Sequence, residues 1–258
     1  MPSGVQLVAF VDDVCVLGIA RNGEAAATLL NPVLEKVSDW MTSNGLKLAP
    51  AKTEAVVLTR KNIYVDPEPF VEGHAIPIKP SMRYLGVELD TRLSFTKHIH
   101  QSSLKASQSA LAIGRLMPNI GRPSQSKRAL LGSVANSRML YASPAWAVRG
   151  TKTAKNRLAM SRSQMTTALR TIRGYRTIST DASSVLSSML PADLLVHERA
   201  RVKDQLAEQL GPTTTAATKA EERKISINSW QARWDRSAAT PEAVGRRWTH
   251  RLLPDIGR

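Results

Sequence analysis

Two short apolar runs near the start of the chain flank a pair of adjacent carboxylates, Asp12 and Asp13. The runs, residues 5–11 and 14–19, are rich in Val, Leu and Ile and too short for buried helices, so they predict two β-strands. A charged doublet between two strands is typical of a two-residue hairpin turn, where Asp is tolerated. Hard cations such as Mg²⁺ prefer oxygen ligands, and one or two carboxylates often hold them. Two interpretations therefore stand side by side: a metal-binding turn, and an ordinary hairpin with a solvated acidic tip.

The composition excludes several classes of protein. The chain has 258 residues, of which 42% are hydrophobic, so it is long and apolar enough for one large or two modest globular domains. The single cysteine, Cys15, excludes an internal disulfide framework and a Cys-rich zinc knuckle, and it fits a reducing compartment. No apolar run approaches about 18 residues, and residues 1–4 carry no basic side chain, so we expect neither a membrane span nor a signal peptide. An intracellular location, nuclear or cytoplasmic, is the expectation.

The net charge of +15 is concentrated in one part of the chain. Residues 1–100 carry 10 Lys and Arg against 11 Asp and Glu, and residues 181–258 carry 12 against 10. Residues 101–180 carry 14 Lys and Arg and no acidic residue at all. A surface that needs only solubility mixes both signs, whereas a long run of one sign repels itself unless it meets a polyanion. We therefore expect this segment to bind nucleic acid, with a bland basic surface as the alternative.

The same segment has helical periodicity. The apolar spacing predicts helices over residues 95–117, 123–140 and 153–172, which would form a bundle with a basic exterior. Further helices are expected near residues 181–190, 193–210, 219–236 and 240–250, with a linker at 211–215. The candidate phosphate contacts of the bundle are Lys105, Arg115, Arg122, Lys127, Arg128, Lys152, Lys155 and Arg157.

Residues 24–43 predict an amphipathic helix that packs on the hairpin sheet. Pro32 lies inside this pattern, so we expect the helix to kink or to split, with Asn31 as a new N-cap. Asn44 and Gly45 give the signal for its C-terminal end. Beyond them, three short strands are predicted, at residues 55–59, 75–78 and 82–90. Gly86, inside the last of these, suggests a bend or the close approach of another backbone.

Three segments in this order resemble the reverse transcriptase of non-LTR retrotransposons, of the jockey-like and ribosomal-DNA-inserted kind. Residues 10–13, Phe-Val-Asp-Asp, resemble the family's aromatic-x-Asp-Asp box. Residues 44–54 resemble its lysine-bearing loop, and residues 84–90 resemble its primer-grip segment. The segments that are similar to the thumb and post-thumb part of such polyproteins are residues 139–146, 175–180 and 245–255.

Together with the element pattern, the resemblance implies an α+β fold in three parts. Residues 1–94 would form a partial right-hand polymerase palm, made of the β-hairpin, a helix and short strands. Residues 95–180 would form a basic, mainly α-helical thumb, and residues 181–258 a helical C-terminal connector. The partners would be an RNA template and a DNA primer, without a membrane, and the sequence leaves protein partners open.

The resemblance also implies roles for particular side chains. Asp12 would be the main Mg²⁺ ligand and Asp13 its weaker neighbour, in a site where two metals clamp the attacking 3′ oxygen and the triphosphate. Lys52 would give a proton to the departing pyrophosphate, although by spacing alone it is simply a solvated lysine. The residues that would seat the primer end are Tyr84, Leu85 and Gly86.

The chain departs from the family at both ends. In the family an upstream strand supplies a further essential Asp, but only eleven residues precede Asp12, which leaves no room for that strand or for the fingers. The C-terminus also stops short of the family's zinc knuckle. We therefore expect a reverse transcriptase fragment that is inactive alone and binds Mg²⁺ weakly or not at all. The alternative is a non-catalytic relic that keeps only its affinity for nucleic acid.

Overall fold

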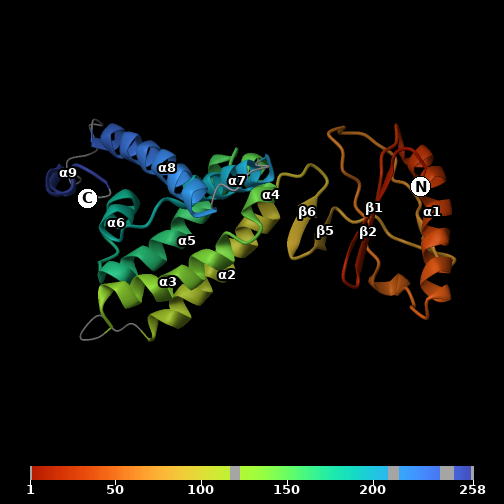
Figure 1. Ribbon diagram of the computed structural model, residues 1–258, viewed down its shortest axis with the longest axis horizontal. Coiled ribbons are helices and arrows are strands. Elements are labelled where there is room, and N and C mark those ends of the chain that lie inside the picture. The colour runs from red at the N-terminus through yellow and green to blue at the C-terminus, as the bar shows by residue number, and fades with distance from the viewer. Residues whose placement is uncertain (1, 117–122, 209–214, 239–246, 257–258) are drawn as a thin grey trace. The chain divides into compact units, whose positions relative to one another are not determined.

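The computed structural model describes residues 2–116, 123–208, 215–238 and 247–256 (Figure 1). The chain divides into two compact units, Met1–Phe95 and Thr96–Arg258. Helices are combined with small antiparallel sheets, which confirms the predicted α+β class. None of the described helices has both the length and the hydropathy that a bilayer crossing requires.

The first unit combines one long helix with two-stranded antiparallel sheets and a short 3₁₀ helix. Its elements are β1 (Val5–Phe10), β2 (Asp13–Gly18), α1 (Gly23–Ser43), η1 (Pro50–Lys52), β3 (Phe70–Val71), β4 (His74–Ala75), β5 (Ser81–Tyr84) and β6 (Val87–Asp90).

The predicted hairpin forms, but its turn begins one residue earlier than expected. β1 and β2 pair antiparallel with Phe10 opposite Asp13, so the two turn residues are Val11 and Asp12. Val11 has a φ of 55°, the positive value that primed hairpin turns require at their first central residue. Asp13 is therefore the first residue of the second strand rather than a turn residue.

Helix α1 runs without a break through Pro32. The Asn22 side chain caps its N-terminus, and the prediction that Pro32 splits the helix with Asn31 as a new N-cap is wrong. The Asn31 amide instead binds the backbone that leads into β3. Its nitrogen donates to the Glu68 carbonyl at 3.2 Å, and its oxygen accepts from the Phe70 N–H at 3.0 Å. These tertiary hydrogen bonds give Asn31 partners within a continuous helix.

The other end of α1 and its packing follow the prediction. Asn44 is the C-cap, and Gly45 follows with a φ of 74°, a left-handed conformation that suits glycine. The helix packs against β2 and β3. Gly18 of β2 permits a close approach, because a Cβ built there would lie only 2.7 Å from Cδ2 of Leu30.

The three strands predicted after α1 take another form. Of residues 75–78, only Ala75 lies in a strand, at the end of β4, and Ile78 makes an isolated bridge. Residues 55–59 do not make a strand, and only the first of them forms an isolated bridge, to Ile78. Residues 82–90 are not one strand with a bend at Gly86 but part of the β5–β6 hairpin. Leu85 and Gly86 both have positive φ, 44° and 81°, as a type I′ turn requires. Gly86 fits both a bend within one strand and a tight turn between two strands, so the sequence pattern could not distinguish these two structures.

The second unit is helical over the residues described. Most of the expected helices are confirmed with small shifts at their ends. The helix at residues 143–150 was not predicted: Pro144 lies in its first turn, where proline is tolerated, although the same residue also signals a break between helices. The expected helix end at residues 117–118, most of the expected linker and the start of the last expected helix lie outside the described residues. The elements are α2 (Thr96–Gly114), α3 (Gln125–Met139), α4 (Ser143–Gly150), α5 (Ala154–Ile172), α6 (Thr180–Leu186), α7 (Ala192–Glu208), α8 (Thr215–Ala238) and α9 (Arg247–Leu252).

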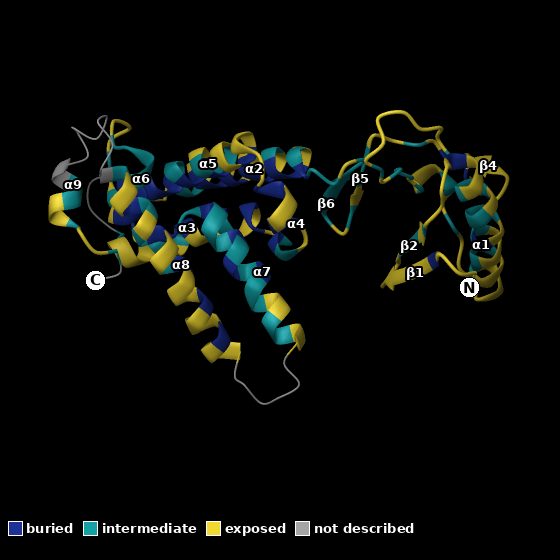
Figure 2. Cartoon of the chain, turned by 90° about the horizontal axis from the view of Figure 1, so that it is seen from above, coloured by how far each residue is buried: buried dark blue, intermediate teal, exposed yellow. Residues whose placement is uncertain are grey.

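Buried apolar side chains hold these helices together. Helix α2 packs against α3 and α5, α4 against α7, and α7 against α8. Figure 2 shows buried residues along α2 and α5, where Ile99 and Met160 are wholly inaccessible to solvent. A second apolar cluster near α6 and α8 consists of Ala182, Val185, Leu190, Trp230 and Trp234.

Candidate nucleic-acid interface

Both carboxylates of the β1–β2 hairpin are exposed at its tip, Asp12 in the turn and Asp13 at the start of β2. In the part of the chain that the structure describes, no three His, Cys, Asp or Glu side chains are grouped so that they could hold a metal ion. Two exposed carboxylates at one hairpin tip suit a single, mostly hydrated Mg²⁺. They fall short of the larger anionic ligand set that a pair of divalent ions requires.

Tyr84 lies close enough to this hairpin to respond to its charge. Burial raises the pKa of the Tyr84 phenol, and the neighbouring Cys15 thiolate and Asp13 carboxylate raise this pKa further. The Tyr84 hydroxyl is shielded from solvent and has no hydrogen-bond partner among the described residues. The charges of the hairpin thus act on one residue of the predicted primer grip, although no hydrogen bond among the described residues joins its hydroxyl to the hairpin. The other two, Leu85 and Gly86, form the adjacent β5–β6 turn.

Lys52 is the last residue of η1 and is exposed. Among the described residues, no hydrogen bond or ion pair joins its ammonium to Asp12 or Asp13. The structure thus leaves Lys52 as a solvated cation on the loop where the sequence predicted it, and does not bring it into contact with the hairpin.

The helical unit presents most of the predicted phosphate contacts to solvent. Residue Arg122 lies outside the described residues. Arg157 is exposed, and its guanidinium also donates to the carbonyls of Thr151 at 2.6 Å and Lys152 at 2.9 Å, which fixes the connection between α4 and α5. The exposed candidates are Lys105, Arg115, Lys127, Lys152, Lys155 and Arg157.

Arg128 differs from these six because it is fully buried. Its Nε donates to the Pro123 carbonyl at 3.1 Å, and its Nη1 donates to the Arg170 carbonyl at 3.0 Å. Burial lowers the pKa of this guanidinium, and the nearby Arg173 and Arg170 lower it further. In this structure the group is bound by backbone carbonyls and is out of reach of a phosphate. We therefore remove Arg128 from the candidate set.

Exposed arginines outside the original candidate set share the same segment. The sequence has no acidic residue between Asp90 and Asp181, and this absence alone would have predicted that every exposed arginine of the segment is a candidate. They are Arg138, Arg149, Arg162, Arg173 and Arg176.

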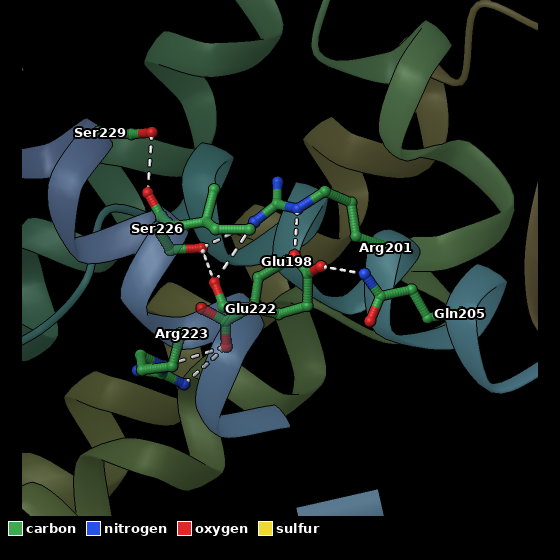
Figure 3. A network of polar contacts seen from close by, with 8 residues as sticks. Glu198, Arg201, Gln205, Glu222, Arg223, Ser226 and Ser229 are labelled. Atoms are coloured by element: carbon green, nitrogen blue, oxygen red, sulfur yellow. Dashed lines mark hydrogen bonds and ion pairs between the residues drawn. The ribbon is translucent and has the colours of Figure 1, made fainter. Parts of the chain in front are cut away.

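A network of ion pairs joins α7 and α8, outside the basic segment 101–180 (Figure 3). Glu222 is almost fully buried and accepts hydrogen bonds from Nε of Arg201 and from Nε2 of Gln205. Glu198 pairs with Arg223 at 2.8 Å. These arginines are neutralised by carboxylates of the same unit, so the network joins two helices and does not serve as a phosphate site.

Comparison with known proteins finds relatives in type-1 retrotransposable elements. The chain is 25% identical over 206 residues, or 78% of its length, to the "Retrovirus-related Pol polyprotein from type-1 retrotransposable element R1 2" of Nasonia vitripennis. Over 97% of its length it is 25% identical to the "Putative 115 kDa protein in type-1 retrotransposable element R1DM" of Drosophila melanogaster. Over 36% of its length it is 32% identical to the "Probable RNA-directed DNA polymerase from transposon X-element" of the same fly.

The matches confirm the resemblance to non-LTR retrotransposon Pol proteins at modest identity over most of the chain. The chain spans only part of each relative: 50% of the Nasonia protein, 25% of the R1DM protein and 10% of the X-element protein. No family model matches the chain, and no solved structure matches it.

Proposed function

We propose that this chain is a piece of a retrotransposon reverse transcriptase, the enzyme that copies an RNA template into DNA from a primer. In this proposal residues 1–94 are the later part of the palm, residues 95–180 are a basic thumb, and residues 181–258 are a helical connector. The observation that carries the proposal is the similarity to R1-type Pol proteins over most of the chain. The hairpin with its two exposed carboxylates and the basic helical unit support it.

The proposed thumb holds the template and primer through their phosphates. Its six exposed candidates come from α2 and the turn that follows it, α3, the α4–α5 connection and α5, in a segment without a carboxylate to neutralise them. Lys and Arg that neutralise phosphates release counterions from the nucleic acid, so binding falls steeply as the salt concentration rises. Phosphate contacts carry little sequence information, so the binding should discriminate weakly between sequences.

In the proposed palm, Asp12 and Asp13 are the residues that would hold Mg²⁺. Their exposed oxygens suit a hard cation. When bound, the metal would stabilise the negative charge of the triphosphate and activate the 3′ hydroxyl of the primer. Tyr84, whose pKa the Asp13 charge raises, would position the primer end. The Lys52 ammonium would give a proton to the pyrophosphate as it departs.

The small number of carboxylates favours a second candidate, a chain that binds nucleic acid without catalysing synthesis. Two divalent ions about 3.5–4 Å apart need several anionic ligands to offset their repulsion. Within the described residues, the hairpin tip supplies two carboxylates and no third metal ligand joins them. We therefore expect the 258-residue chain to bind a primed template but not to extend the primer.

Binding and primer extension measured on the same protein separate the two candidates. The purified chain is mixed with an RNA template annealed to a DNA primer, Mg²⁺ and deoxynucleotides, and the Asp12→Ala variant is the matched control. We expect both proteins to bind and neither to extend the primer. Extension that disappears in the variant would mean that a carboxylate from elsewhere, or from a second copy, completes the site. Absence of binding by either protein would contradict the proposed function.

A further inference from the structure

An exposed tyrosine stands in the loop that follows α5. Tyr175 is 83% exposed, and its sequence neighbours Arg173 and Arg176 are exposed as well. A tyrosine ring usually buries its apolar body and leaves only the hydroxyl wet. A single exposed apolar side chain is ordinary on its own, so the surroundings of this ring decide whether it has a role.

Hydrogen bonds fix the backbone on both sides of Tyr175. Helix α5 ends at Ile172, and its C-cap Arg173 has the left-handed conformation, with a φ of 58°. The N–H of Gly174 then donates to the Leu169 carbonyl at 2.8 Å, which closes the end of the helix. The N–H of Ile178 donates to the Tyr175 carbonyl at 3.2 Å and forms the next turn.

Apolar packing also fixes this turn on its buried side. A Cβ built at Gly174 would lie 2.8 Å from Cδ1 of Ile178 and 3.0 Å from Cδ1 of Ile172, so these two side chains close over the glycine. Ile178 also packs against the apolar cluster near α6 and α8. The turn is therefore anchored to the core of the unit, and it presents the Tyr175 ring from a defined position.

Three helix ends that carry cations lie close to this turn. The Arg170 side chain lies against the end of α2, since a Cβ built at Gly114 would be 3.3 Å from Nε of Arg170. Nη2 of Arg173 donates to the carbonyl of Pro123, just before α3, at 3.3 Å. The ends of α2 and α5 and the start of α3 are thus adjacent. Among the described residues, the cations of these helix ends and of the turn that are at least partly exposed are Arg115, Lys127, Arg170, Arg173 and Arg176.

We propose that Tyr175 stacks on an unpaired base of a single-stranded nucleic acid while the surrounding arginines contact its phosphates. An aromatic ring beside a cationic groove is the arrangement by which proteins bind single strands without reading their sequence. A duplex exposes the face of a base only at its ends, so a ring on a basic surface favours an unpaired base. This inference rests on the proposed function, and it adds a preference for strand state that phosphate contacts alone do not give.

The test measures the affinity of the full chain for four probes at one salt concentration. The probes are a single-stranded oligouridylate, an abasic strand with the same number of phosphates, a blunt RNA duplex, and heparin, a polyanion without bases. The variants are Tyr175→Ala, Tyr175→Leu, which keeps apolar bulk, and Tyr175→Phe, which keeps the ring. Tyr141→Ala is the matched control, because Tyr141 is also exposed, at 53%, and lies between α3 and α4.

We expect Tyr175→Ala and Tyr175→Leu to weaken binding of the oligouridylate by about 5- to 150-fold, the range for loss of one stacked base. Tyr175→Phe and Tyr141→Ala should bind it like the unaltered chain. All variants should keep their affinity for the abasic strand, the duplex and heparin.

Two results would overturn the inference alone. One is an unchanged affinity of Tyr175→Ala for the oligouridylate in a protein that still binds the duplex. The other is an equal loss on all four probes, which would mean that the ring acts on the fold or on anions in general. Failure of the unaltered chain to bind either a strand or a duplex would instead contradict the proposed function itself, and the inference with it.

Discussion

The Arg128 guanidinium donates a hydrogen bond to the carbonyl oxygen of Arg170 at 3.0 Å and so ties α3 to the end of α5. Its Nε donates a second hydrogen bond, to the Pro123 carbonyl just before α3. Burying a charge is costly unless it is hydrogen-bonded, and these carbonyls supply the acceptors. A residue in the most basic part of the sequence therefore holds the fold together.

Replacing Arg128 should destabilise the helical unit. Arg128→Met removes both hydrogen bonds and leaves the Arg170 carbonyl without its guanidinium donor, whereas the Pro123 carbonyl keeps the bond from Arg173, so we expect a cost of about 1–3 kcal/mol. The neighbouring Lys127→Met changes an exposed side chain and should alter stability by less than about 0.5 kcal/mol. Urea unfolding followed by circular dichroism gives both values. Equal stability of the two variants would refute the structural role of Arg128.

Replacing Glu222 should destabilise the packing of α7 against α8. Its almost fully buried carboxylate binds Arg201 and Gln205, so Glu222→Ala leaves Arg201 without its counterion. We expect a loss of about 3 kcal/mol, at the low end for a broken buried ion pair, because the Arg201 side chain is 37% exposed. The adjacent Glu221→Ala, on the exposed face, is the control and should change little. Thermal unfolding that does not distinguish the two variants would argue against the network.

Alkaline pH should weaken the first unit through Tyr84. The folded state raises the pKa of this phenol above its ordinary value of 10.0, by burial first and then by Cys15 and Asp13. A group with a raised pKa contributes stability that is fully present below the unfolded pKa and is lost as pH rises through the folded pKa. Stability should therefore fall above about pH 10. Tyr84→Phe should flatten that fall, as measured by urea unfolding at a series of pH values, and an identical fall in both proteins would contradict the assignment.

Local sequence patterns predicted the elements well where one pattern has one meaning. Apolar runs around Asp12 and Asp13 predicted the first hairpin, and helical periodicity predicted most of the helices of the second unit. The turn of that hairpin is shifted by one residue, because strand register depends on the pairing of Phe10 with Asp13, which a single sequence does not display. Leu85 and Gly86 form a hairpin turn where the sequence predicted one strand with a bend. A glycine inside a strand pattern fits both, and only the pairing of β5 with β6 decides between them.

The candidate interface was harder to predict because charge alone does not report burial. Lys127 and Arg128 are adjacent in the sequence, yet one is exposed and the other is fully buried. Successive helix residues point in different directions, and only the packing of α3 against α5 determines which one faces inward. The hydrogen bonds of the Asn31 amide could not be predicted from local sequence either, because its partners lie 37 and 39 residues away in the chain.

The salt dependence of binding to a primed RNA template tests the central claim most directly. The unaltered chain is compared with a variant in which the six exposed candidates, Lys105, Arg115, Lys127, Lys152, Lys155 and Arg157, are changed to Gln. The control changes Lys219 and Lys224 to Gln, two exposed lysines of α8 outside the basic segment. We predict a steep fall of affinity with salt for the chain and the control, and a slope of log affinity against log salt that is smaller by up to about 5 in the six-site variant. An affinity that does not change with salt, or the same slope in all three proteins, would contradict the account.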